Sequence, residues 1–471
     1  MKVEQIYTGC LAQGAYYIIS NGEAAIVDPL RETKPYLERL QKDGVKLKYV
    51  FETHFHADFV SGHIDLSKAT GAAIIYGPNA ICDFGCISAK DAEEFKVGDI
   101  IIKALHTPGH TMESTTFLLK DEGGKDYCIF SGDTLFLGDV GRPDLAQKAA
   151  HMTQDDLAGL LYDSLMTKIM PLADDVIVYP AHGAGSACGK NMMKETVDTL
   201  GNQKRVNYAL NQPSKEAFIK AVTDGLQPPP GYFGLNVAMN KKGYKSFDSV
   251  LSQGMKALTP DEFEAVAENT GALILDTRSA ADFYKGFIPQ SINIGLVGDF
   301  APWVGAMIVQ VKQALLLVTD EGKEEEAVTR LSRVGFDNVL GHLKGGFAAW
   351  LGAGKVADIV DRISAEQFAG EVDIAKDKII DIRKETEYSA AHIDDAYNRP
   401  LAAINEWIKE INPDEHFYVH CASGYRSMIA ASILQSRGYR NFTEVAGGFK
   451  AISTTNLPKS DFVCPSRVSK T

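Results

Sequence analysis

The feature that most constrains the fold of this chain is an internal repeat in its second half. A capping-box pattern, in which a hydroxyl residue is followed at a fixed distance by Glu or Gln, occurs at Thr259–Glu262 and again at Ser364–Gln367. Each pattern precedes an apolar segment that ends in arginine, at Arg278 and Arg383, and both intervals are 105 residues. A short helix followed by a buried strand, present twice, predicts two copies of one α/β module, each about a hundred residues long.

The first half of the chain alternates strand and helix patterns. The segments YYIIS and AAIVDP are apolar like buried strands, Lys34–Asp43 is amphipathic with a helical period, and Leu47–Phe51 is a further strand. The proline run Pro228–Pro230 and the polar stretch after it indicate the end of this domain. In a chain of 471 residues, the patterns predict three α/β domains, over 1–246, 247–358 and 359–471.

Several histidine and aspartate residues of the first half follow apolar, strand-like segments. Because the ends of strands meet at the edge of a sheet, we expect these side chains to converge on a metal site. Imidazole and carboxylate groups suit a divalent ion such as zinc or iron. A single His-x-His pattern is a weak signal, but recurrence behind separate strands is hard to obtain by accident. The residues are His54, His56, Asp58, His110, Asp133 and His182.

The motif HFHADF, which begins at His54, together with the later histidine and aspartate residues, resembles the H-x-H-x-D-H pattern of the metallo-β-lactamase superfamily. The resemblance implies an αββα sandwich for the first domain, followed by the two repeated α/β domains. The third histidine of the pattern is Phe59 in this chain. A dinuclear zinc hydrolase of the glyoxalase II type needs that histidine for its second metal ion, so a mononuclear site is favoured.

Within that superfamily, the segments GDTLFLGDVGRPD and YPAHG are similar to the persulfide dioxygenases. That resemblance implies one Fe(II) per chain, which zinc can replace in the isolated protein, with positions left for O2 and substrate. The implied ligands are His54, His110 and Asp133. The implied residues that orient those ligands are His56, Asp58 and His182.

Two further residues of the first domain each leave two interpretations open. Arg142 is expected either to bind an anionic group of the substrate or to form a buried salt bridge with Asp139 or Asp144. Cys188 is expected either to be a packing residue or to lie close enough to the metal to relay sulfane sulfur.

A cysteine in the setting of a reactive thiolate occurs in the last repeat. Cys421 follows the apolar segment FYV and precedes a helical segment, so it faces backbone N–H groups and the positive end of a helix dipole. Four residues separate Cys421 from Arg426, a loop tighter than that of the Cys/Arg phosphatases and suited to a single sulfur atom. The loop resembles the C-x-x-G-x-R loop of the rhodaneses, which implies sulfur transfer through a Cys421 persulfide. The implied substrate contacts are Ser423, Gly424, Tyr425 and Arg426. Further matches to the rhodanese pattern are Asp381, Arg383, Glu387 and His392.

The middle copy of the repeat lacks the cysteine and the arginine of this loop. Its corresponding segment runs from Val318 to Glu324 without a cysteine, and Glu324 stands where the arginine should be. A carboxylate at that position would raise the pKa of any neighbouring thiol. We therefore expect residues 247–358 to form a catalytically inactive rhodanese-like domain that serves in packing or docking.

Charge, hydropathy and cysteine content bound the partners and the compartment. The net charge of −13 argues against nucleic acid or an anionic membrane as a partner, because both would repel the chain. No apolar stretch approaches about 18 residues, and the amino terminus lacks the pattern of a signal peptide. Seven scattered cysteines favour free thiols in the cytoplasm over a disulfide framework.

The whole chain resembles the bacterial persulfide dioxygenase–rhodanese fusions. The resemblance implies oxidation of a low-molecular-weight thiol persulfide by O2 to sulfite, coupled to exchange of sulfane sulfur between persulfide, sulfite and thiosulfate at Cys421. These activities would serve sulfide detoxification, and we expect a homo-oligomer. One alternative is a zinc thioester hydrolase of the glyoxalase II type fused to a sulfurtransferase, and Phe59 argues against it. The other alternative is a sulfur carrier or binding protein in which the first domain is only a docking module. The intact set of His54, His110 and Asp133 argues against this alternative.

Overall fold

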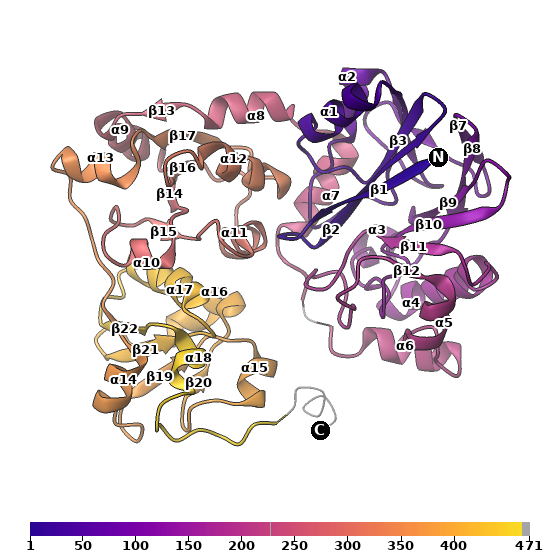
Figure 1. Cartoon of the computed structure of the whole chain (residues 1–471). Helices are drawn as coiled ribbons and strands as arrows, with labels where there is room; N and C mark the ends of the chain where they lie inside the picture. The colour runs from indigo at the N-terminus through magenta and orange to yellow at the C-terminus, as the bar shows by residue number, and fades with distance from the viewer. Residues whose placement is uncertain (227, 464–471) are drawn as a thin grey trace. The chain divides into compact units, whose positions relative to one another are not determined.

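The structure is a computed structural model that describes residues 1–226 and 228–463 of the chain. The chain divides into two compact units (Figure 1). The first consists of Met1–Ser249, Val309–Val311 and Thr329–Asp337, and the second of Val250–Ile308, Lys312–Val328 and the chain from Asn338 onward. Among the described residues, no helix combines the length and the apolar character needed to cross a bilayer. By these bounds, the predicted first domain lies in the first unit, and most of both repeat copies lies in the second.

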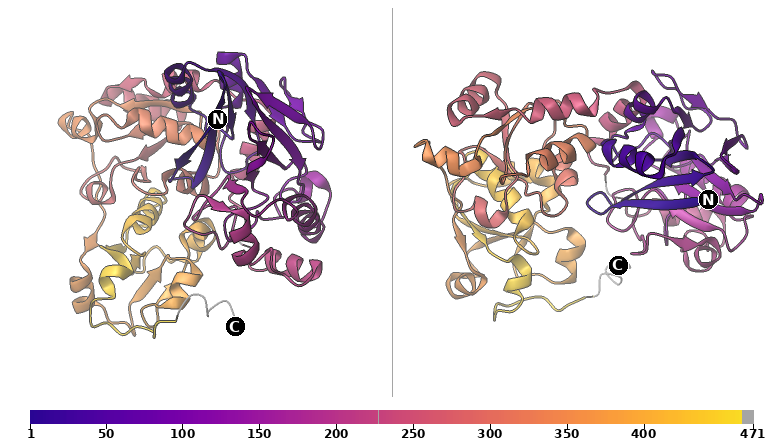
Figure 2. Two further views of the ribbon diagram at one scale, coloured as in Figure 1. Left: turned by 45° about the vertical axis from the view of Figure 1, so that its right-hand side comes forward. Right: turned by 45° about the horizontal axis from the view of Figure 1, so that its top comes forward.

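The first unit contains two six-stranded sheets, drawn in indigo to magenta in Figures 1 and 2. In spatial order, the first sheet consists of β1 (Lys2–Thr8), β2 (Gln13–Ser20), β3 (Glu23–Val27), β4 (Lys46–Phe51), β5 (Ala73–Tyr76) and β6 (Ile87–Ser88). The second sheet consists of β12 (Asp198–Thr199), β11 (Ile177–Pro180), β10 (Asp126–Gly132), β9 (Thr115–Lys120), β8 (Ile100–His106) and β7 (Glu94–Val97). Strands β2 and β3 are almost wholly buried, as expected of strands covered on both faces.

Helices cover the outer face of each sheet. Helix α1 (Lys34–Asp43) has the predicted bounds, and its Tyr36 joins the apolar cluster on the outer face of the first sheet. Leu161 of α4 (Gln154–Ser164) and Phe218 of α6 (Lys215–Thr223) join the cluster on the second sheet. Phe51 and Phe117 meet in the core between the sheets, with ring centroids 4.8 Å apart. This helix–sheet–sheet–helix order confirms the predicted αββα sandwich. The other helices of this part of the chain are α2 (His63–Thr70), α3 (Gln147–Ala150), α5 (Leu200–Val206), α7 (Phe233–Lys242), α8 (Phe247–Gly254) and a π-helical turn at Leu165–Ile169.

The second unit contains two five-stranded parallel sheets with the same strand order, drawn in pink to yellow in Figure 2. In spatial order, one consists of β13 (Ala257–Leu258), β17 (Val339–Leu343), β16 (Leu315–Val318), β14 (Leu273–Asp276) and β15 (Ile292–Asn293). The other consists of β18 (Arg362–Ile363), β22 (Phe442–Val445), β21 (Phe417–His420), β19 (Lys378–Asp381) and β20 (Tyr397–Asn398). The equal order confirms the repeat that the sequence predicts.

Both predicted capping boxes begin helices. Thr259 caps α9 (Pro260–Thr270) and Ser364 caps α14 (Ala365–Glu371), and in each case the side chain three residues on bonds back to the cap. The remaining helices are α10 (Ala280–Phe283), α11 (Phe300–Met307), α12 (Glu324–Arg333), α13 (Gly346–Gly352), α15 (Glu385–Ala390), α16 (Ile404–Trp407), α17 (Tyr425–Ser436), α18 (Gly448–Ile452) and the 3₁₀ turns Leu401–Ala403 and Ile408–Glu410.

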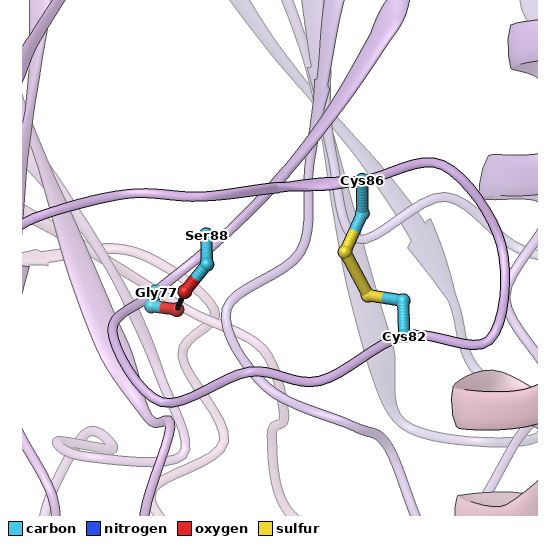
Figure 3. Close-up of a disulfide and its surroundings, with 4 residues drawn as sticks. All are labelled: Gly77, Cys82, Cys86 and Ser88. Atoms are coloured by element: carbon cyan, nitrogen blue, oxygen red, sulfur yellow. Dashed lines mark hydrogen bonds between the residues drawn. A yellow bond between two sulfur atoms is a disulfide. The ribbon is translucent and has the colours of Figure 1, made fainter.

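The expectation that the cysteines are all free thiols is wrong. Cys82 and Cys86 form a disulfide in the segment between β5 and β6 (Figure 3). Their Cα atoms lie 6.3 Å apart, which is within the range that a disulfide requires. A hydrogen bond from the Ser88 hydroxyl to the Gly77 carbonyl joins the two ends of the same segment. The free cysteines of the described residues are Cys10, Cys128, Cys188 and Cys421, and Cys464 lies outside those residues.

Candidate metal centre and thiol loop

The first unit contains a buried cluster of the three predicted metal ligands. One ligand atom from each of His54, His110 and Asp133 lies within 4.8 Å of the others. Asp133 Oδ2 is 3.4 Å from His110 Nε2 and 3.8 Å from His54 Nε2, and it is buried without a hydrogen-bond partner among the described residues. A buried carboxylate oxygen costs free energy unless it is paired. Two imidazoles and one such oxygen therefore fit a divalent metal ion.

The three side chains meet because their strands end together. His54 follows β4, and Asp133 follows β10 of the opposite sheet. At the end of β10, Gly132 has a φ of 55°, and a Cβ atom there would lie 2.6 Å from Thr53. Only glycine permits this approach of the two strand ends without strain. The glycine of the SGD segment thus brings Asp133 close to His54.

Hydrogen bonds to the far nitrogen orient both histidine ligands. Thr53 Oγ1 donates to Asp28 Oδ2 at 2.8 Å, so its lone pair accepts from His54 Nδ1 at 2.9 Å. His110 Nδ1 lies 2.9 Å from the carbonyl oxygen of Arg142, which can only accept. Both rings therefore carry their proton on Nδ1 and present Nε2 to the cluster. Burial also lowers the pKa of His54 well below its usual value, so that ring is neutral.

His182 connects the cluster to a second buried group. Its Nδ1 lies 2.9 Å from Asp133 Oδ1, and its Nε2 lies 2.8 Å from Asp58 Oδ2. Burial alone would lower the pKa of His182, but Asp133 and Asp58 outweigh it and raise that pKa well above its usual value. Burial alone would raise the pKa of Asp133, yet the surrounding histidines, His182 first, lower it. Asp58, His182 and Cys188 form a second set of ligand atoms within 4.8 Å of one another.

His56 belongs to another buried polar group, although its ring centroid lies only 4.2 Å from that of His54. Its Nε2 lies 3.0 Å from Asp28 Oδ1 and 3.5 Å from Glu52 Oε2, in a separate buried polar group. Burial, and then Asp28, raise the pKa of Glu52 well above its usual value. Phe59 is fully buried and packs on the His56 ring at 4.3 Å between centroids. The place of the third motif histidine is thus apolar and filled.

Of the two interpretations of Arg142, the structure contains the salt bridge. Its guanidinium binds both oxygens of Asp144 at 2.6 and 2.7 Å and the carbonyl oxygen of Ala187 at 3.2 Å. The carboxylate of Asp139 instead accepts from backbone N–H groups, including that of Lys190. The carbonyl of Arg142 orients His110, so this residue supports the cluster through its main chain.

The last repeat holds Cys421 in the predicted strand-to-helix loop, between β21 and α17. The Gly424 N–H donates to Cys421 Sγ at 3.1 Å, and Gly424 has a φ of 101°, a left-handed conformation that favours glycine. Arg426 does not contact the sulfur by a hydrogen bond; its guanidinium binds Glu387 through two contacts of 2.7 and 2.8 Å.

The other predicted contacts of the loop have different surroundings. The Tyr425 hydroxyl donates to the carbonyl of Gly295, in the middle repeat, at 2.8 Å. The Ser423 side chain, within the loop, is exposed. Asp381 and Arg383 form a buried ion pair behind the loop, at 2.5 Å. In the middle repeat, buried Thr319 follows β16 as Cys421 follows β21, and Glu324 begins α12 as the counterpart of Arg426.

Four residues of these two sites were not predicted from the sequence. Asp28 and Thr53 orient His54, and the only signals for them are the polar ends of the apolar segments AAIVDP and KLKYVFET. Ser427 and Glu444 lie beneath Cys421, with Ser427 Oγ at 3.4 Å from the sulfur. Ser427 directly follows Arg426, but nothing in the sequence pattern separates Glu444 from an ordinary strand residue.

Comparison with known proteins agrees with both parts of this arrangement. The model of the metallo-β-lactamase superfamily matches residues 8–86, and that of the rhodanese-like domain matches 259–353 and 364–455. The chain is similar to the persulfide dioxygenase ETHE1 of Homo sapiens, with 29% identity over 47% of this chain and 79% of the relative. It is also similar to the cytoplasmic hydroxyacylglutathione hydrolase of Arabidopsis thaliana, with 30% identity over 39% of this chain and 67% of the relative.

A crystal structure of a metallo-β-lactamase from Staphylococcus aureus matches over a longer range. The two share 30% sequence identity with a TM-score of 0.65, and the match covers 73% of this chain and 99% of that chain. Together with the sandwich and the buried histidine and aspartate cluster, these likenesses show the family. The chain belongs to the metallo-β-lactamase superfamily, and two rhodanese-like domains follow its metallo-β-lactamase domain.

Proposed function

We propose that the first domain is a persulfide dioxygenase and that the last repeat is a thiosulfate sulfurtransferase. In the first reaction, a thiol persulfide, O2 and water give the free thiol, sulfite and two protons. The observation that carries the proposal is the ligand set of His54, His110 and Asp133, combined with Phe59 in place of the third motif histidine. Such a set suits one Fe(II) and leaves open positions.

The residues of the chain prepare this site for one ion. His54 and His110 present Nε2 because their Nδ1 protons are bound elsewhere, and Asp133 directs its unpaired Oδ2 at both rings. His182, bound to Asp133 Oδ1, fixes that carboxylate and leaves Oδ2 free to ligate. Iron(II), when bound, supplies the one-electron chemistry that lets O2 react with a sulfur nucleophile.

The last repeat would carry sulfane sulfur on Cys421. The thiolate attacks the outer sulfur of a persulfide or of thiosulfate, the donor leaves as thiol or sulfite, and Cys421 holds the transferred sulfur. The Gly424 N–H and the amino end of α17 favour the anionic sulfur. Sulfite released by the first domain accepts that sulfur to give thiosulfate. Because the product of the first domain is a substrate of the last repeat, joining the two in one chain is chemically useful.

A zinc thioester hydrolase is the second candidate, and two observations favour it. Hydroxyacylglutathione hydrolases are among the similar proteins, and Asp58, His182 and Cys188 form a second set of metal-ligand types. A hydrolase of that kind requires two metal ions, with water as the attacking group. The filled apolar position of Phe59 favours the mononuclear oxygenase instead.

Oxygen uptake by the iron-loaded full chain separates the two candidates. With glutathione, coenzyme A and bacillithiol persulfides as substrates, we expect O2 consumption and no hydrolysis of a hydroxyacyl-glutathione thioester. Asp133→Ala should lose metal and O2 uptake together. Asp175→Ala, which removes an exposed carboxylate paired with Lys125, is the matched control and should keep both. Thioester hydrolysis with two metal ions per chain and no O2 uptake would reject the oxygenase.

The expected partners are small molecules, namely a low-molecular-weight persulfide, O2, sulfite and thiosulfate. We also propose that the chain acts as a homo-oligomer in the cytoplasm. The free thiols Cys10, Cys128, Cys188 and Cys421 support a reducing compartment. The Cys82–Cys86 disulfide is the observation that points the other way.

A further inference from the structure

Beneath the thiol loop, buried polar side chains connect Cys421 to the sheet of the last repeat. Ser427 Oγ lies 3.4 Å from Cys421 Sγ and 2.5 Å from Glu444 Oε1. Glu444 Oε2 in turn lies 2.7 Å from Arg362 Nε. The exposed fraction is 1% for Cys421 and 0% for both Ser427 and Glu444, so all three side chains are buried. The hydroxyl group of Ser427 therefore connects the Glu444 carboxylate to the Cys421 sulfur.

The direction of these hydrogen bonds follows from the groups themselves. An ionised carboxylate only accepts, so the Ser427 hydroxyl donates to Glu444. The lone pairs of that hydroxyl then face Cys421, whose S–H donates to them. The three groups form a continuous path along which a proton can leave the sulfur.

The middle repeat shows that the fold does not need this path. The backbone register pairs Arg362 with Glu444 in the last repeat and Ala257 with His342 at the same place in the middle repeat. Thr319 replaces the cysteine there. The carboxylate and its arginine therefore occur in the copy that carries the thiol and are missing from the copy that lacks it. A purely structural pair would be expected in both.

We propose that Glu444 takes the proton of Cys421 through Ser427 when the sulfur becomes anionic. The Cys421 S–H bond breaks as Ser427 accepts that proton, and Ser427 passes its own proton to Glu444 Oε1. No net charge is created in the buried site, and no oxidant or reductant is needed. The thiolate left behind keeps the Gly424 N–H as a donor. The proposal rests on the sulfurtransferase role of Cys421, and Glu444 is a positioning residue because it acts through Ser427.

The charges around the pair suit this exchange. Arg362, from β18, is a charged side chain in contact with Glu444, and Arg426, which lies in the loop of Cys421, is paired with Glu387. Burial raises the pKa of Glu444, and Arg362 reverses only part of that rise. A carboxylate whose pKa is raised by burial binds a proton more readily than a carboxylate exposed to water.

The pH profile of Cys421 alkylation tests the proposal without any sulfur donor. The full chain is treated with iodoacetamide between about pH 5 and pH 10, and the Cys421 peptide is quantified by mass spectrometry. In the unchanged protein, Cys421 and Glu444 share one proton, so the rate should rise in two steps separated by a plateau. Glu444→Gln cannot take the proton, so we expect one step and a rate about tenfold lower near pH 6.

A second variant keeps the ion pair intact. Ser427→Ala removes only the connecting hydroxyl and should give the same single step as Glu444→Gln. A two-step profile in Ser427→Ala would overturn the role of Ser427. Faster alkylation of Glu444→Gln at low pH would overturn the whole proposal, because it would mean that the carboxylate only repels the thiolate. A two-step profile in a protein without sulfurtransferase activity would reject the proposed function and keep the proton path.

Discussion

Thr53→Val isolates the hydrogen bond that orients the ligand His54. Valine has nearly the shape of threonine, so the packing of Thr53 against Gly132 is retained. The hydroxyl is lost, and with it the 2.8 Å donor to Asp28 Oδ2 and the 2.9 Å acceptor of His54 Nδ1. Both atoms remain buried, so each loses its partner without gaining water.

The size of the effect follows from these two losses. Leaving a buried polar group unsatisfied costs about 1–3 kcal/mol of folding stability. Loss of a group that orients a metal-binding histidine lowers metal affinity about 10- to 100-fold, or about 1.4–2.8 kcal/mol. Thr53→Ser keeps the hydroxyl and should stay near the unchanged protein in both respects.

Competition with a chelator measures the metal affinity of the three proteins, and urea unfolding of their metal-free forms measures stability. We expect Thr53→Val alone to lose affinity and stability together. Affinity equal to that of the unchanged protein would refute the orientation of His54 by Thr53. If Thr53→Ser lost as much metal affinity as Thr53→Val, the methyl group of Thr53, and not its hydroxyl, would be responsible for the effect.

Three other changes test the assignment of roles. Asp133→Ala should retain less than one tenth of the bound metal, measured by elemental analysis, because it removes one of three ligands; retention of about one ion per chain would contradict this. Phe59→His should raise the metal content from about one toward two ions per chain, since it restores the missing imidazole; unchanged content would mean that Phe59 does not set the metal count. Cys421→Ser should abolish thiosulfate sulfurtransferase activity in the full chain, and any activity left would show that another cysteine carries the sulfur, with Cys188 the next to replace.

The architecture was predictable because its signals are local. Capping boxes and an arginine-ending strand recur at a fixed interval, so the repeat over 247–358 and 359–471 could be found without a structure. The metal cluster was predictable for a related reason: each of His54, His110 and Asp133 follows an apolar segment, and strand ends meet at a sheet edge. Both predictions need only patterns within short segments of the sequence, and not the pairing of distant segments.

Contacts that join distant segments were not predictable in the same way. The approach of Glu444 to Ser427 depends on the pairing of β21 with β22, and the sequence shows only a glutamate in a short apolar strand. The disulfide of Cys82 and Cys86 was missed because an odd, scattered set of cysteines argued for free thiols, although their spacing allows a bond. Cys188 lies beside Asp58 and His182, and its role as a sulfur relay stays a prediction.

The ratio of O2 to persulfide consumed is the most direct test of the central claim. Cys421→Ser should consume about one O2 per persulfide and release sulfite, because only the first domain acts. The unchanged chain should use about one O2 for two persulfides and release thiosulfate, because sulfite then accepts sulfur from Cys421. Persulfide loss without O2 uptake, or the same ratio and product in both proteins, would contradict the coupled activities.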